Sequence, residues 1–194
     1  MELVEKIIAA TLLSGGVVSA WATGFRPATL LFLAPNLFVL TLVLIRRKAA
    51  QISDSPLDWA LPLAASAAPQ LLVAVSTPPM APGWLALGAM ASGGLLSLFA
   101  IIVLGRSFGI FPANRGVKRW GPYALVRHPM YLGYALWQLG FVLANPGIGN
   151  ALVLGVAFGL QAWRVKREER VLLGDPLYRS YCQRVRAKFI PLAY

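Results

Sequence analysis

Residues 127–131, with the sequence RHPMY, place an arginine, the only histidine of the chain and a proline at the start of an apolar stretch. Proline disfavours helical angles in the residue before it, so His128 is expected at the cap and Pro129 at the first helical position. The N–H groups of such a helix start attract a carboxylate or phosphate. Arg127 adds a forked cationic donor, and His128 can titrate near neutral pH. The segment is suited to bind an anion, and the alternative is an interfacial arginine and a cap that contact no ligand.

A second group of charged residues occurs at 164–169, with the sequence RVKREE. In a helix, offsets of three and four residues place Arg164, Arg167 and Glu168 on one face. Glu168 is suited to hold a cationic or hydroxyl-rich ligand, and Arg164 is suited to hold an anionic one. The alternative is a solvated cluster of ion pairs without a ligand.

The elements that carry these residues are strongly apolar. The chain has 194 residues, of which 58% are hydrophobic and 13% charged, whereas a soluble domain has about 25% charged residues. A helix of about 20 apolar residues crosses a bilayer. The sequence therefore predicts an all-α integral membrane protein. Runs without a formal charge cover residues 7–25, 27–45, 59–105 and 128–163.

Prolines and glycines divide the two longer runs, so that about six transmembrane helices are expected. The segment STPPMAPG separates spans at about 59–76 and 82–104, and NPGIGN separates shorter spans near 129–144 and 147–163. Each of the last two is at or below the length that crosses a bilayer. A short helical hairpin that crosses only in part is the alternative for this pair.

The basic residues predict the orientation. In the six-span arrangement all of them except Arg26 fall on one side, which places both termini, the loop 105–128 and the tail 164–194 in the cytoplasm. The net charge of +11 is attributed to topology and to contact with anionic membrane lipids, not to nucleic acid. With one cysteine, Cys182, and one histidine, no disulfide and no metal site are expected.

The polar tail is predicted to form cytoplasmic helices. The segment WRVKREERVLLG extends the last span as an amphipathic helix that ends at Gly174. A second short helix is expected in DPLYRSYCQRVRAKF, with Pro176 in its first turn. Residues 1–194 are expected to form a single domain, in which 1–104 hold spans one to four.

Four motifs occur in order: GPYxxVRHPMYLG, then N-P, then RxxREExxL, then GDPxYxxY. This order resembles the isoprenylcysteine carboxyl methyltransferase family and its relatives, the membrane phospholipid methyltransferases, over residues 100–191. The resemblance implies that S-adenosylmethionine binds in a pocket at the cytoplasmic membrane surface, with S-adenosylhomocysteine as product and a separate opening towards lipid. It makes 105–194 the cofactor-binding catalytic core.

The resemblance also implies roles for single residues. Arg164 matches the position that contacts the methyl acceptor, and Arg164, Glu168 and His128 are expected to take part in catalysis. The cofactor carboxylate would suit Arg127 or His128 at the helix start, and its amino group or ribose hydroxyls would suit Glu168. The expected cofactor-binding residues are Val117, Lys118, Tyr123, Arg127, His128, Pro129, Tyr131 and Glu168.

The predicted function is methyl transfer from S-adenosylmethionine to a lipophilic acceptor from the bilayer, as in the isoprenylcysteine carboxyl methyltransferases. Such a transfer needs no metal and depends on positioning of the reactants. One alternative is a phospholipid amine N-methyltransferase, because the segment LGRSFGI at 104–110 resembles the phospholipid methyltransferases. Such an enzyme needs a base to remove a proton from the amine, and His128, Glu168 and Glu169 are the candidates. Further alternatives are an NADPH-dependent membrane reductase of similar fold and a non-enzymatic lipid-binding membrane protein.

Overall fold

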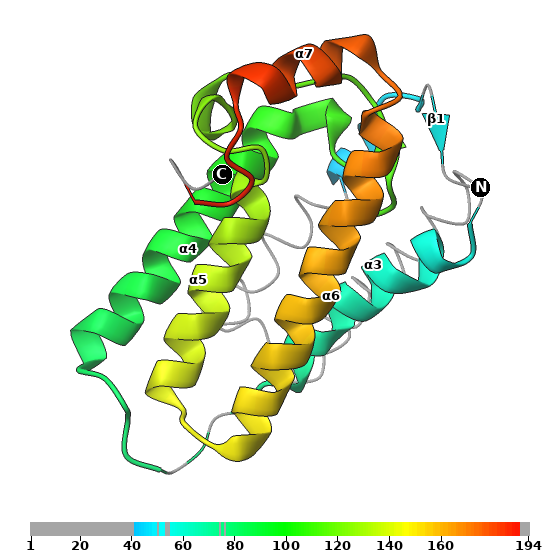
Figure 1. Ribbon diagram of the computed structural model, residues 1–194. Coiled ribbons are helices and arrows are strands. Elements are labelled where there is room, and N and C mark those ends of the chain that lie inside the picture. The colour runs from blue at the N-terminus through cyan, green and yellow to red at the C-terminus, as the bar shows by residue number, and fades with distance from the viewer. Residues whose placement is uncertain (1–40, 50, 53–54, 74, 76, 191–194) are drawn as a thin grey trace.

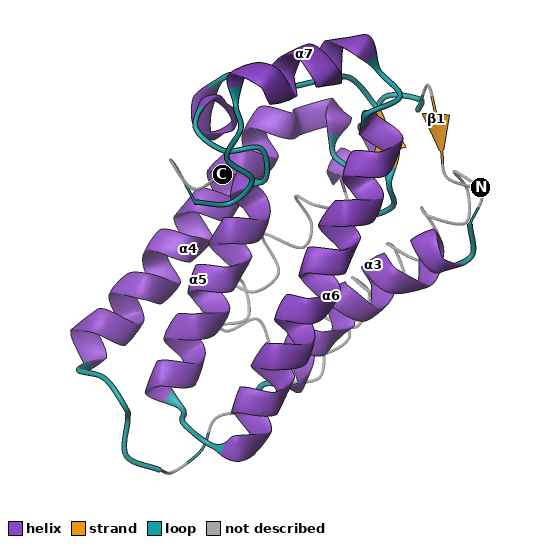
Figure 2. Cartoon of the chain, in the orientation of Figure 1, coloured by secondary structure: helices purple, strands orange, loops and turns teal. Residues whose placement is uncertain are grey.

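The protein is mainly helical, and its longest helices lie side by side (Figure 1, Figure 2). The computed structural model describes residues 41–49, 51–52, 55–73, 75 and 77–190. The predicted span at 7–25 and most of the one at 27–45 lie outside the described residues. The described end of the second span, residues 41–45, is helical.

The described elements follow one another as helices joined by short connections. The bounds of the α-helices are α3 Leu57–Ala67, α4 Gly83–Leu104, α5 Pro129–Ala144, α6 Ile148–Leu172 and α7 Pro176–Arg184. The 3₁₀ helices are η1 Ala68–Leu71, η2 Gly105–Ser107 and η3 Gly121–Ala124. Two short antiparallel strands, β1 Gln51–Ile52 and β2 Ala113–Asn114, pair Gln51 with Asn114.

Several helix boundaries are those that the sequence predicts. His128 is the N-cap of α5, and Pro129 is its first residue. Pro176 begins α7, after Asp175, whose side chain accepts a hydrogen bond from the backbone N–H of Leu177. The amphipathic stretch after the last span belongs to the same continuous helix, α6. Helix α7 ends at Arg184, so the expectation that it includes residues 185–189 is wrong.

The predicted span at 59–76 is wrong in its extent. Helix α3 begins at Leu57, and the helical backbone changes to the 3₁₀ form at Ala68 and ends at Leu71. Pro69 has no backbone N–H to continue the α-helical pattern, which explains the change. The α-helical part has 11 residues, or a length of about 16 Å.

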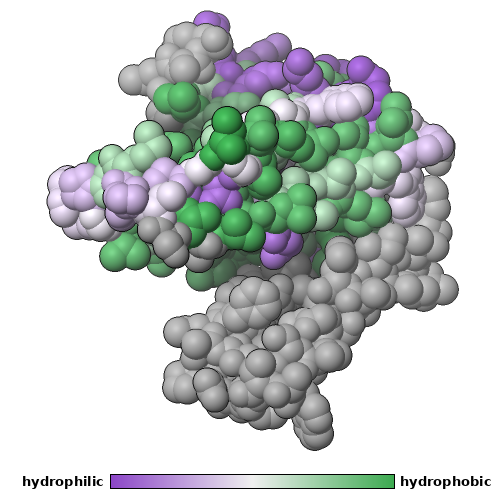
Figure 3. All heavy atoms as spheres, turned by 90° about the horizontal axis from the view of Figure 1, so that it is seen from below, coloured by the Kyte–Doolittle hydropathy of each residue, from purple (hydrophilic) through white to green (hydrophobic). Residues whose placement is uncertain are grey.

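Within the described residues, two helices are long and apolar enough to cross a membrane, over residues 83–107 and 148–172. Helix α5 has 16 residues, or about 24 Å, which is less than the roughly 30 Å of a bilayer core. Seen from the end opposite α7, the described surface is mainly apolar (Figure 3). The arrangement with six spans stays a prediction.

Helices α4 and α5 pack closely through glycines. A Cβ atom built on Gly93 would lie 2.5 Å from the backbone N of Trp137 and 2.6 Å from the carbonyl oxygen of Gly133. Small residues of this kind let two helices approach each other in a membrane protein. The core formed beside them includes Ala100 and Val103 of α4 and Val165 of α6, so it lies at the end of the bundle where α5 begins.

Gly93→Ala is expected to lower the free energy of unfolding by about 1–3 kcal/mol, because the added methyl group overfills the α4–α5 contact. Gly88→Ala on the same helix is the control, since a Cβ there meets no atom within 4 Å. Thermal unfolding of the purified protein in detergent measures both changes. Equal midpoints for the two variants would contradict the packing described here.

Candidate active site

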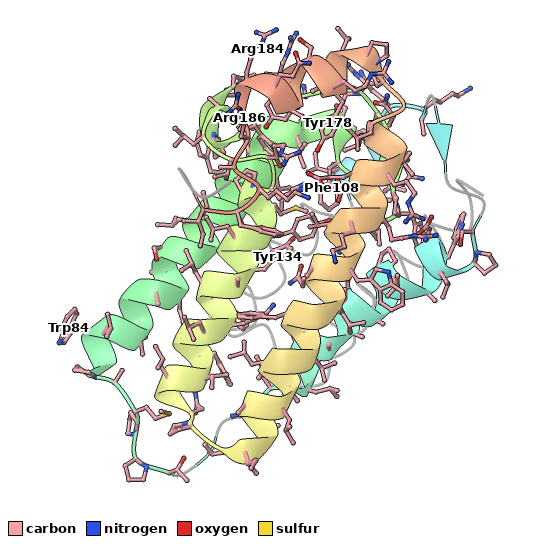
Figure 4. All side chains as sticks on the ribbon, in the orientation of Figure 1. Trp84, Phe108, Tyr134, Tyr178, Arg184 and Arg186 are labelled. Carbon is pink, nitrogen blue, oxygen red and sulfur yellow. The ribbon has the colours of Figure 1, made fainter. Side chains whose placement is uncertain are left out.

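A pocket lies at the end of the bundle where α4 ends and α5 begins, and α7 crosses this end (Figure 4). The empty space inside it is about 710 Å³, with the part that opens to solvent included. The lining residues are Leu104, Ser107, Gly109, Phe111, Ala113, Arg115, Gly116, Val117, Lys118, Tyr123, Arg127, His128, Met130, Tyr131, Glu168, Leu172, Tyr178 and Tyr181.

The start of α5 is joined to the C-terminal segment 186–189. The backbone N–H of Arg127 donates to the carbonyl of Ala187 at 3.0 Å, and that of His128 donates to the carbonyl of Lys188 at 2.9 Å. The ring of Phe189 lies 6.0 Å from the ring of His128. These two N–H groups are therefore not available to an anionic ligand, although the sequence suggested donors at this helix start.

Glu169 is the centre of a buried ion-pair network. Its Oε1 lies 2.9 Å from Nη1 of Arg127 and 3.2 Å from Nε2 of His128, and its Oε2 lies 2.6 Å from Nζ of Lys188. The side chains of Glu169 and His128 are 8% and 5% exposed. Arg127 also donates to Sγ of Cys182 at 3.2 Å. The guanidinium of Arg127 lines the pocket but already has a carboxylate partner.

Glu168, the neighbour of Glu169, faces the pocket instead. The hydroxyl of Tyr131 donates to Oε2 of Glu168 at 2.7 Å. On the other side of Tyr131, Cζ of Arg164 lies 5.3 Å from the centre of the ring. Arg164 is buried, and its Nη2 donates to the carbonyl of Ile110 at 2.7 Å. The ring of Tyr131 therefore contacts both charged residues that the sequence singled out.

Arg167 has a different position from the one its helical spacing suggests. Its Nε forms an ion pair with Asp58 of α3, and its Nη2 donates to Oγ of Ser55 at 3.1 Å. These contacts join α6 to α3. Arg167 is therefore a structural residue, although it lies one turn from Arg164.

Helix α7 is fixed above the pocket at both of its ends. Asp175 accepts hydrogen bonds from Nδ2 of Asn114 and from the backbone N–H of Leu177, each at 2.8 Å. The hydrogen bond from Asn114 lowers the pKa of Asp175, which keeps this carboxylate charged. Near the other end, the hydroxyl of Tyr181 donates to the carbonyl of Tyr123 at 2.7 Å.

The tyrosines of the pocket are neutral donors. Burial raises the pKa of Tyr123, and the negative charge of Glu168 raises it further. Burial also raises the pKa of Tyr178, and Glu169 adds to the effect. Both phenols therefore stay protonated near neutral pH.

The structure brings most of the predicted site residues together. Those that line the pocket are Val117, Lys118, Tyr123, Arg127, His128, Tyr131 and Glu168. Pro129 is not among the lining residues, and its side chain is fully buried. Arg164 does not line it either and lies behind Tyr131.

Sequence reasoning missed three residues of this region. Glu169 was considered as a base or as part of a solvated ion-pair cluster, and its buried pairing with Arg127, His128 and Lys188 was not foreseen. Tyr178 and Tyr181 line the pocket but were not assigned as site residues. Both lie in the GDPxYxxY motif, so that motif was a signal for them.

The fold and the pocket define a helical protein with a pocket lined in part by charged and aromatic side chains at one end of an apolar bundle. A model of the isoprenylcysteine carboxyl methyltransferase family matches residues 85–174. This match supports the family that the motifs predicted. Members of the family are membrane-associated, in agreement with the two long apolar helices.

Three named relatives are similar to the chain. Protein-S-isoprenylcysteine O-methyltransferase B of Arabidopsis thaliana is 29% identical over 188 residues, which cover 84% of this chain and 92% of that protein. Protein-S-isoprenylcysteine O-methyltransferase A of the same plant is 35% identical over 79 residues, 37% of each protein. The Schizosaccharomyces pombe protein-S-isoprenylcysteine O-methyltransferase is 34% identical over 113 residues, 52% of this chain and 46% of that protein. The names indicate an enzyme, a methyltransferase.

Glu169→Gln is expected to lower the free energy of unfolding by about 3–5 kcal/mol, because it leaves the largely buried guanidinium of Arg127 without its carboxylate. Glu168→Gln is the matched control, since Glu168 accepts from the neutral phenol of Tyr131 and its change should cost less than about 1 kcal/mol. Denaturation of the ligand-free protein gives both values. A larger loss for Glu168→Gln would contradict the central place of Glu169.

Proposed function

We propose that this protein transfers a methyl group from S-adenosylmethionine to the carboxylate of a prenylated cysteine that enters from the membrane. The observation that carries the proposal is the convergence of three family motifs, around His128, Glu168 and Tyr178, on one pocket. The three relatives are named isoprenylcysteine O-methyltransferases. These names favour an oxygen acceptor over a phospholipid amine, a reductase or a non-enzymatic role.

The chemistry of the pocket fits S-adenosylmethionine. This cofactor supplies a methyl group on a positively charged sulfur. A nucleophile attacks the methyl carbon in line with the carbon–sulfur bond, and S-adenosylhomocysteine leaves. The carboxylate of Glu168 can accept hydrogen bonds from an ammonium or a ribose hydroxyl. The rings of Tyr123 and Tyr131 offer aromatic faces, which attract a cation. Lys118 provides a positive charge at the pocket wall for a carboxylate.

Arg164 is the residue that we assign to the acceptor. One of its N–H groups donates to the carbonyl of Ile110, and a guanidinium has five N–H donors in all. The remaining donors suit a planar carboxylate, which Arg binds with two parallel hydrogen bonds. A carboxylate acceptor is already a nucleophile and needs no general base. The residues of the chain would therefore act by holding the two reactants in line.

The proposal includes the placement of the site in the membrane. The chain has six spans in one domain over residues 1–194, with the core at 105–194 and both termini in the cytoplasm. The support is the charge distribution: Arg184 and Arg186 lie at the α7 end of the molecule (Figure 4), while the described surface at the opposite end is mainly apolar (Figure 3). A prenyl chain would stay in the bilayer while its carboxylate reaches Arg164.

The purified protein is expected to bind S-adenosylhomocysteine and to methylate an S-prenylated cysteine. Calorimetry in detergent measures the binding, and radiolabelled S-adenosylmethionine measures the transfer. The product should be a methyl ester, so base should release its label as methanol. A total lipid extract serves as the competing acceptor. A base-stable labelled lipid amine in place of the ester would contradict the proposed acceptor.

Arg164 and Glu168 are expected to differ in their kinetic roles. Glu168→Ala should raise the Kd for S-adenosylhomocysteine, because it removes a lining carboxylate. Arg164→Ala should leave this Kd nearly unchanged and raise the acceptor KM or lower kcat, because it removes an acceptor contact. Arg164→Lys should restore activity only in part, since an ammonium lacks the forked geometry.

Arg167→Ala is the matched control for these variants, because Arg167 lies on the same helix and contacts Asp58 and Ser55 instead. It should lower stability without a specific change in the acceptor KM. Equal loss of cofactor affinity in Arg164→Ala and Glu168→Ala, with normal acceptor kinetics, would remove the acceptor role of Arg164.

A further inference from the structure

Two tyrosines of α7 face the same pocket. Tyr178 and Tyr181 are one helical turn apart, both line the pocket, and their rings lie 5.7 Å from each other. Both are buried, with exposed fractions of 4% and 2%. The same helix thus presents two phenols to the same pocket.

The hydroxyl groups of these tyrosines are in different situations. That of Tyr181 donates to the carbonyl of Tyr123 at 2.7 Å, so it fixes α7 to the segment before α5. That of Tyr178 is buried and has no hydrogen-bond partner among the residues that the structure describes. A buried tyrosine hydroxyl normally has a partner, and one without a partner destabilises the folded protein.

We propose that the hydroxyl of Tyr178 is a binding contact for the cofactor and donates a hydrogen bond to an oxygen or nitrogen atom of S-adenosylmethionine. The inference rests on the proposed function, because it takes the occupant of the pocket to be this cofactor. It adds a contact from α7 to those expected from the RHPMY segment. Figure 4 shows Tyr178 under α7, on the side that faces the bundle, whereas Arg184 points away from it.

The surroundings of Tyr178 favour donation over acceptance. Glu168 and Glu169 both act on this phenol, and their charges together with burial raise its pKa, so the proton is retained. Glu168 already accepts from Tyr131, and Glu169 is engaged by Arg127, His128 and Lys188. Neither carboxylate forms a hydrogen bond with Tyr178. A hydrogen-bond acceptor atom of a bound ligand would give the Tyr178 hydroxyl its missing partner.

The proposal makes a prediction in which stability and affinity change in opposite directions. In the ligand-free protein, Tyr178→Phe removes an unpaired buried hydroxyl, so the midpoint of thermal unfolding should stay the same or rise. In the complex it removes a hydrogen bond, so the Kd for S-adenosylhomocysteine should rise about three- to tenfold. The KM for S-adenosylmethionine should rise as well, and the acceptor KM should not change.

Tyr181→Phe is the matched control, because it deletes the same group one turn away where the hydroxyl is already bonded within the protein. It should lower the unfolding midpoint, and any rise in the Kd should be smaller than the rise for Tyr178→Phe. The experiment uses the full chain in detergent, with calorimetry and thermal unfolding in the presence and absence of S-adenosylhomocysteine. If Tyr178→Phe cannot be purified in folded form, Tyr178→Met serves instead, because methionine fills irregular space without a hydroxyl.

The outcomes separate the inference from the proposed function. If the wild-type protein does not bind S-adenosylhomocysteine, the proposed function fails. If the wild type binds and the Tyr178 variant binds equally well, the hydroxyl meets only water and the inference is overturned. A variant of Tyr178 with a lowered unfolding midpoint and an unchanged Kd would likewise show a structural residue and overturn it.

Discussion

The buried carboxylate of Glu169 is the contact on which the rest of this site depends. It pairs with Arg127, His128 and Lys188, which come from the segment before α5 and from the C-terminal segment. A buried charge is tolerated only when partners compensate for its lost hydration, so these segments have to meet at one point on α6. Their meeting fixes the start of α5 and the position of the His128 ring. The walls of the pocket are therefore set by an interaction that lies beside it.

The two adjacent glutamates divide two tasks because a helix turns about 100° per residue. Glu169 faces the α5 start, and Glu168 faces Tyr131 and the pocket. The same geometry separates the two arginines of the motif: Arg164 lies over the ring of Tyr131, and Arg167 reaches Asp58 on α3. One short charged segment thus supplies a candidate binding residue, a structural ion pair, the link to α3 and the candidate acceptor contact.

Local signals in the sequence predicted the parts of this arrangement that depend on local chemistry. The cap at His128, the proline at position 129 and the start of α7 at Pro176 follow from the restricted backbone of proline. The motif resemblance located Glu168 and Tyr131.

The role of Glu169 was not predictable, because its partner Arg127 lies 42 positions earlier in the chain and Lys188 lies 19 positions later. The sequence also could not predict that the hydroxyl of Tyr178 has no hydrogen-bond partner among the described residues, because this depends on how the segments pack. The early end of helix at Leu71 was missed because apolar composition alone does not distinguish a span from a shorter helix.

Tyr131 contacts both the residue proposed to bind the cofactor and the residue proposed to bind the methyl acceptor. Its hydroxyl is held by Glu168, and its ring face is covered by the guanidinium of Arg164. A cofactor held by Glu168 and an acceptor held by Arg164 would therefore meet around a single rigid ring, which cannot shift towards one ligand without moving relative to the other. In-line displacement depends on the distance and angle between donor and acceptor. A side chain that is fixed at both its hydroxyl and its face is suited to set them. In the proposed function the prenyl chain stays in the bilayer beside the apolar helices, so the carboxylate would approach Arg164 from that side and the cofactor from the polar end.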